Sequence, residues 1–172
     1  FVPQPITMTR ASAGTRVNPE GLVETVELLG SEEVTNGDFA TDSDWTKGTG
    51  WTISGGTANA NTSGSYINFY QNSVFTIGKA YKYEFTILNY SQGEVRFTQG
   101  GVDVSGVKNA NGTYTGVFSA SQTSLYFQGV SSFIGSIDNV SVKEVTRNNL
   151  ARVDYDGTAS SLLADIYIFR LF

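Results

Sequence analysis

The sequence predicts an all-β fold, an antiparallel β-sandwich with extended β arms at both ends of the chain. Aromatic residues make up 13% of the 172 residues, and 19 glycines stand against 3 prolines, as expected for a protein with many strands and turns. Short runs that alternate apolar and polar residues recur from Glu33 to Val145, and none has the helical period of 3.6. A chain of this length should bury roughly 70% of its unfolded surface, which is enough for one core.

Composition excludes several classes of function. The net charge of −5 gives no basic surface for nucleic acid. The chain has no His and no Cys, so a Ser-His-Asp triad, a Cys-His dyad, a zinc site and a disulfide are all impossible. A carboxylate pair for glycoside hydrolysis remains formally possible, but the acidic residues stand in polar, solvated settings, so we expect no enzyme. No run of about 18 apolar residues predicts a membrane span.

The first segment, residues 1–30, is predicted to be an arm followed by a β-hairpin. Thr7–Val17 reads as an extended polar stretch, and Asn18–Gly21 (NPEG) as a turn. After this turn, Leu22–Leu29 is predicted to form a strand, so that Thr7–Leu29 is a hairpin. Phe1–Gln4 does not read as a signal peptide.

Residues 31–146 form the central module, in which turn signals separate short strands. Ala80–Tyr90 is the clearest strand, because its aromatic and aliphatic residues recur at every second position and share one face. The apolar phase breaks inside Phe133–Val145, which predicts a bulge at Asp138-Asn139. The remaining predicted strands are Ser65–Gln71, Glu94–Gln99, Thr113–Ser119 and Ser124–Gly129.

Residues 147–172 end in the most apolar stretch of the chain, Ser160–Phe172. Burying each large apolar side chain contributes roughly 1.5–3 kcal/mol, so this stretch should pack against something. It either adds a strand to its own sandwich or augments a sheet in a neighbouring subunit, and we favour the second. A helix is also possible, but Ile166–Phe169 favours a strand. The predicted assembly residues are Leu162, Leu163, Ile166, Ile168, Phe169, Leu171 and Phe172.

Four motifs carry a resemblance to a known kind of domain. NGDF (Asn36–Phe39), Gly50-Trp51, YKYEF (Tyr81–Phe85) and SIDNVSV (Ser136–Val142) resemble the jelly rolls of carbohydrate-binding modules. They resemble more closely the jelly-roll module found repeatedly in tailed-phage virion proteins. The match covers about Ser31–Val145. The flanks Thr9–Glu24 and Ala151–Leu163 look like two halves of a phage tail or fibre segment into which the jelly roll is inserted.

The resemblance also implies a structural calcium ion that ties the first strand of the jelly roll to the last. Asp38 and Asp138 match the positions that would hold it, and Glu33 is a third candidate oxygen donor. The alternative is that Asp38 hydrogen-bonds within its own turn and Asp138 ends a bulge.

Glycan binding needs exposed aromatic rings, because sugar rings stack their C–H faces on them, with polar neighbours for the hydroxyls. Trp51 is expected in the core. Each candidate could instead be ordinary sheet surface. The candidates are Trp45, Tyr66, Tyr70, Gln99, Tyr126 and Gln128.

Together these features predict a non-enzymatic structural and adhesive virion protein, such as a fibre, tail accessory or capsid decoration protein. Its partners would be copies of itself, other virion proteins and cell-surface glycans, and its place would be the virion. The rival hypothesis is a glycan-binding module of a secreted bacterial protein. A glycosidase ranks third.

Overall fold

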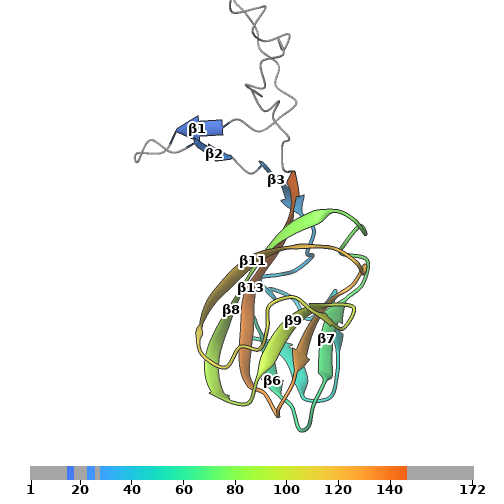
Figure 1. Ribbon diagram of the computed structural model, residues 1–172. Coiled ribbons are helices and arrows are strands. Elements are labelled where there is room, and N and C mark those ends of the chain that lie inside the picture. The colour runs from blue at the N-terminus through green and yellow to red at the C-terminus, as the bar shows by residue number, and fades with distance from the viewer. Residues whose placement is uncertain (1–14, 18–22, 26–27, 147–172) are drawn as a thin grey trace, which may run out of the picture. The chain divides into compact units, whose positions relative to one another are not determined.

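The computed structural model describes residues 15–17, 23–25 and 28–146 (Figure 1). By internal contacts the chain divides into Leu29–Thr146 and a second unit of Phe1–Leu28 with Arg147–Phe172. In the second unit, β1 (Thr15–Val17) and β2 (Val23–Thr25) pair antiparallel. This pairing confirms a hairpin in the N-terminal segment.

The strand that was expected to end at Leu29 is divided in the structure. Its first part is β2, whereas Leu28 and Leu29 begin β3 (Leu28–Glu32). That strand pairs with β13 (Ile134–Thr146) of the central module. The C-terminal arm, residues 147–172, lies outside the described residues.

Two antiparallel sheets form the module, which confirms the predicted jelly-roll β-sandwich. The five-stranded sheet has the order β10-β9-β12-β7-β4, with bounds Val102–Asp103, Val95–Gln99, Leu125–Gly129, Ile67–Gln71 and Thr46–Lys47. The six-stranded sheet has the order β11-β8-β13-β6-β5, with β3 added on β13. Besides β3 and β13, its strands are Gly112–Ser119 (β11), Ala80–Gln92 (β8), Thr57–Asn61 (β6) and Trp51–Ser54 (β5).

Aromatic side chains fill the space between the sheets. Phe127 of β12 lies between Phe69 of β7 and Phe97 of β9 in register, and all three are fully buried. From the other sheet, Phe85 meets Phe127 edge-on at 5.1 Å and Tyr83 stacks on Phe97 at 4.7 Å. Such pairs contribute about 0.5–1.5 kcal/mol each beyond the burial of their area.

Strand β8 has the predicted faces, because every second residue from Tyr81 to Ile87 is buried. The predicted bulge in β13 is also confirmed. The register between β13 and β8 shifts between Asp138 and Ser141, and Asn139 has a positive φ of 51°. Strands β5 and β6 are not among the strands predicted from the sequence. Strand β6 reads TANAN, whose inward residues Ala58 and Ala60 are small and lack the strand preference of β-branched residues.

Candidate functional site

The outer surface of the five-stranded sheet carries an unusual set of side chains. Because Phe69, Phe97 and Phe127 point into the core, the residues next to them in each strand point outward. Tyr66, just before β7, joins this surface through its contact with an outward arginine. We call this surface the tyrosine face and define it by Tyr66, Asn68, Tyr70, Arg96, Thr98, Asp103, Tyr126 and Gln128.

One row of the tyrosine face crosses four strands. In this row each residue lies opposite the next across neighbouring strands: Tyr70 of β7, Tyr126 of β12, Thr98 of β9 and Asp103 of β10. The rings of Tyr70 and Tyr126 are 4.8 Å apart and inclined at 54°. Both tyrosines are partly exposed. The sheet therefore presents two adjacent rings held in fixed register.

A second row runs beside the first and is polar. Gln128 lies opposite Asn68 on one side and Arg96 on the other. Arg96 Nε donates a hydrogen bond of 3.1 Å to Gln128 Oε1. The Arg96 guanidinium lies 5.3 Å from the centre of the Tyr66 ring, in a cation–π contact. The two rows thus combine aromatic rings with amide, hydroxyl and guanidinium groups.

Two oxygens of this face lack a hydrogen-bond partner within the described residues. They are Asn68 Oδ1 and Thr98 Oγ1, and both atoms are buried. Thr98 itself is 0% exposed. Buried polar atoms are nearly always paired, so these two oxygens are candidates for bonding an ordered water molecule. Within the part of the chain that the structure describes, no other side-chain nitrogen or oxygen has this property.

The solved structures that are similar to this chain include the following two. One is described as "BiXyn10A CBM1 APO"; it is 16% identical, the match covers 64% of this chain and 94% of that one, and the TM-score is 0.45. The other is described as "CBM4 structure and function"; it is 15% identical, with 64% and 98% covered and a TM-score of 0.42. At this identity and TM-score, the likeness says nothing about which ligand the chain binds. No protein-family model matches the chain, and no curated protein matches it.

The expectation that Trp45 is an exposed platform is wrong. Its side chain is only 6% exposed and stacks on Phe69 at 4.7 Å with an angle of 4°. The indole nitrogen donates a hydrogen bond of 3.1 Å to the Asn36 carbonyl oxygen. Trp51 also stacks on Phe69, at 4.9 Å, and is buried, which confirms its place in the core. Both tryptophans are therefore core residues.

Gln99 is also wrongly placed among the surface candidates. Its side chain is buried, and its Oε1 accepts hydrogen bonds from the backbone N–H groups of Ser121 and Gln122. Its Nε2 donates to the Ser119 carbonyl oxygen at 3.2 Å. Gln99 thus fixes a loop. Gln128 does lie in the tyrosine face, but at 7% exposure it is buried, and its Oε1 accepts a hydrogen bond from Arg96 Nε.

The three candidate tyrosines have the exposure that ligand contact needs. Tyr66 is 58% exposed and adopts a positive φ of 61°, and the other two form the ring pair of the first row. Four members of the face were not predicted from the sequence. The only signal for them was the alternation of inward and outward residues along each strand, which does not show which strands are neighbours. The four are Asn68, Arg96, Thr98 and Asp103.

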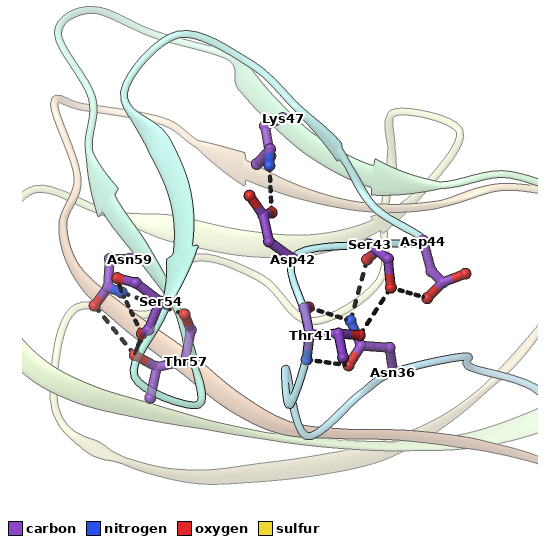
Figure 2. A network of polar contacts seen from close by, with 9 residues as sticks. All are labelled: Asn36, Thr41, Asp42, Ser43, Asp44, Lys47, Ser54, Thr57 and Asn59. Carbon is purple, nitrogen blue, oxygen red and sulfur yellow. Dashed lines mark hydrogen bonds and ion pairs between the residues drawn. The ribbon is translucent and has the colours of Figure 1, made fainter.

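The Asn36–Asp38 turn is attached to β13, as the paired motifs imply. Val140 N donates a hydrogen bond of 2.9 Å to the Gly37 carbonyl oxygen. A Cβ at Gly37 would lie 2.0 Å from the Val140 carbonyl oxygen, so only glycine fits there. The turn continues into a loop organised by Asn36, whose amide donates to the carbonyl oxygens of Thr41 at 2.7 Å and Ser43 at 3.1 Å (Figure 2).

Two of the three proposed calcium ligands, Asp38 and Asp138, have local partners. Asp38 Oδ1 accepts a hydrogen bond of 3.4 Å from Ala40 N, and Asp138 Oδ1 accepts one of 2.7 Å from Asn139 N. Glu33 lines a separate small cavity with Asp44. Across the described ranges, no three acidic side chains gather closely enough to hold a metal ion. The local contacts favour the turn and bulge roles, and the calcium site stays a prediction.

The predicted assembly residues, from Leu162 to Phe172, lie outside the described residues, so the intersubunit strand stays a prediction. The described part of the chain contains no helix of the length and hydrophobicity that a membrane crossing requires.

Proposed function

We propose that this protein is a non-catalytic glycan-binding module and that the tyrosine face holds the glycan. The observation that carries the proposal is the ring pair of Tyr70 and Tyr126, both partly exposed on the tyrosine face. Beside it lie two buried oxygens, Asn68 Oδ1 and Thr98 Oγ1, that have no partner among the described residues. Sugars offer both kinds of group that such a surface would bind. Their C–H faces stack on aromatic rings, and their hydroxyls both donate and accept hydrogen bonds.

Single-stranded nucleic acid is the other ligand that stacks on aromatic rings. Its phosphates require a groove lined with cations, and binding is mostly electrostatic. The tyrosine face as defined has one cation, Arg96, on a protein of net charge −5. The charge therefore favours a glycan.

Catalysis on the same face is disfavoured by its acidic residues. Glycoside hydrolysis ordinarily uses two carboxyl groups on opposite sides of the scissile bond. Asp103 is the single carboxylate among the residues that define the tyrosine face. We therefore propose binding without turnover.

The setting in which the module works rests on the resemblance of the flanking segments to phage tail or fibre proteins. A virion protein that assembles through its apolar C-terminal segment remains our preferred setting, and a secreted bacterial protein is the alternative. Deleting Asp165–Phe172 should then abolish assembly and leave the module folded. Light scattering coupled to size exclusion, with and without a calcium chelator, tests both the assembly and the calcium predictions.

A glycan array probed with wild-type protein and a Tyr70→Ala/Tyr126→Ala variant tests the proposed function. We expect the wild type to bind a defined set of glycans and the double variant to lose that set. Val117→Ala is the matched control, because Val117 is exposed on the six-stranded sheet. No binding by wild-type protein, or undiminished binding by the folded double variant, would contradict the proposal.

A further inference from the structure

Arg96 is the one cationic residue of the tyrosine face, and its surroundings leave much of its hydrogen-bonding capacity unused. Its side chain is 21% exposed. Nε donates to Gln128 Oε1, and this is its one hydrogen bond among the described residues. A guanidinium carries five N–H donors, so those on the two terminal nitrogens remain.

The nearest carboxylate does not satisfy these donors. Arg96 Nη1 lies 3.6 Å from Asp103 Oδ2, whereas charge-assisted hydrogen bonds are about 2.7–2.9 Å long. The other carboxylate oxygen, Asp103 Oδ1, accepts a hydrogen bond of 2.9 Å from Gly106 N. Asp103 is thus held by its own turn and forms an ion pair with Arg96 at 3.6 Å, without a charge-assisted hydrogen bond between them.

Tyr66 holds the other side of the guanidinium in place. The loop before Tyr66 is pinned to the loop after β12: Gly64 N donates to Ser132 Oγ at 3.1 Å, and Ser132 N donates to the Gly64 carbonyl oxygen at 2.9 Å. Tyr66 adopts a φ of 61°, which is uncommon for a bulky residue and carries strain. The strained backbone places an exposed ring against Arg96, so the guanidinium is oriented before any ligand arrives.

We propose that Arg96 binds the carboxylate of a uronic acid residue, so that the glycan held by the tyrosine face is acidic. This inference rests on the proposed glycan-binding function and names its ligand class. The two terminal nitrogens of Arg96 make no hydrogen bond among the described residues, and a planar guanidinium matches the two oxygens of a carboxylate. A single charge suits the site better than a dianionic phosphate, because there is one cation and Asp103 lies close by.

The test compares each hexuronate oligomer with its own methyl ester, which keeps the sugar and removes the charge. The panel holds oligomers of galacturonate, glucuronate, mannuronate and guluronate, and affinities are measured by titration calorimetry. We expect wild-type protein to bind at least one acid about tenfold more tightly than its ester, with the difference shrinking as salt rises.

Four variants locate the effect. Arg96→Gln should bind acid and ester equally, and Arg96→Lys should keep part of the preference, because lysine retains the charge without the planar fork. Asp103→Asn should raise the affinity for the acid severalfold by removing a competing charge. Lys82→Gln removes a charge from the six-stranded sheet and should leave the affinities for the acid and the ester unchanged. Thermal unfolding of each variant confirms that it folds.

The outcomes separate this inference from the proposed function. If neutral glycans bind through Tyr70 and Tyr126 while no acid exceeds its ester, the uronate inference is wrong and glycan binding stands. A preference that persists in a folded Arg96→Gln variant would equally overturn the role of Arg96. If no glycan of either kind binds, both proposals fail.

Discussion

The two outer faces of the sandwich differ in what their polar groups do. On the six-stranded sheet they bond one another: Thr86 and Thr113 hydroxyls lie 3.0 Å apart, and Thr115 Oγ1 donates to the Tyr83 carbonyl oxygen at 2.9 Å. On the tyrosine face, two buried oxygens have no partner among the described residues. Among the described residues, the buried side-chain oxygens without a partner therefore lie on the second surface and not on the first.

The faces also differ in where their aromatic rings point. In β8 of the six-stranded sheet, Tyr81, Tyr83 and Phe85 are all buried, and the residues between them are polar. In β7 and β12, Tyr70 and Tyr126 point outward although phenylalanines fill the inward positions beside them. Aromatic residues on both faces of one strand are more than a core requires. This excess is one reason why we propose the five-stranded sheet as the binding surface.

The six-stranded sheet has a cavity of its own, which makes it a real competitor. This cavity has a volume of about 170 Å³ and is lined by Lys82, Glu84, Ser141 and Lys143 among others. It lacks an outward aromatic ring for a sugar to stack on, since Tyr83, which also lines it, is a buried core residue. Experiments that perturb each face in turn therefore decide between them.

The largest expected effect comes from beneath the tyrosine face. Trp45→Ala should lower the free energy of unfolding by about 3–5 kcal/mol, because it removes a buried ring stacked on Phe69. Trp45→Phe should lower it less, since a ring remains. Denaturant unfolding measures both. If Trp45→Ala has a small effect on stability and abolishes glycan binding, Trp45 is an exposed ligand contact and its assignment to the core is wrong.

The rings of the tyrosine face should contribute through their stacking surface. Tyr126→Ala should weaken glycan binding about tenfold, while Tyr126→Phe should change it less than twofold, because the ring is kept. Calorimetric titration with a glycan found on the array gives both values. Equal losses in the two variants would assign the contact to the hydroxyl instead.

Thr98→Val separates stability from binding. Removing a buried hydroxyl that has no partner among the described residues should raise the free energy of unfolding by about 1 kcal/mol. Glycan binding should change little, because Thr98 is 0% exposed. The matched control is Thr115→Val on the other face, where the hydroxyl is bonded to the Tyr83 carbonyl oxygen. That variant should lose about 1 kcal/mol of stability. A destabilised Thr98→Val variant would show that its hydroxyl is satisfied in solution.

The smallest effect concerns pH. Burial raises the pKa of the Tyr83 hydroxyl, and the Asp103 carboxylate raises it further. The folded state therefore favours neutral tyrosine, and this stabilisation is fully present below about pH 10 and lost as the pH rises through the folded-state pKa. In thermal unfolding above about pH 10, the Tm of wild-type protein should fall more steeply than that of Tyr83→Phe. Parallel curves would contradict this assignment.

Alternation and turn signals predicted an antiparallel β-sandwich, and the resemblance of four motifs predicted the jelly roll. Alternation also predicted the buried face of β8 and the β13 bulge, because an inward aromatic row and a break in phase are local properties of the sequence. The site was harder to predict. Trp45 looked exposed because it follows a polar loop, yet its neighbours in space, Phe69 and Asn36, bury it and bond its indole nitrogen.

Contacts between distant strands decide the rest of the site. Arg96 belongs to the site only because β9 lies beside β12 and the loop before β7 brings Tyr66 over its guanidinium. In the sequence, β7 and β8 separate Tyr66 from Arg96, and nothing there indicates their contact. The unpaired state of Thr98 Oγ1 likewise depends on every residue packed around it.

Mapping a glycan titration onto backbone amide chemical shifts tests the central claim most directly. We predict that the shifts gather on β7, β9 and β12, with the largest changes around Asn68, Tyr70, Arg96 and Tyr126. Shifts that gather instead on Lys82, Glu84 and Lys143 would assign binding to the six-stranded sheet and contradict the account.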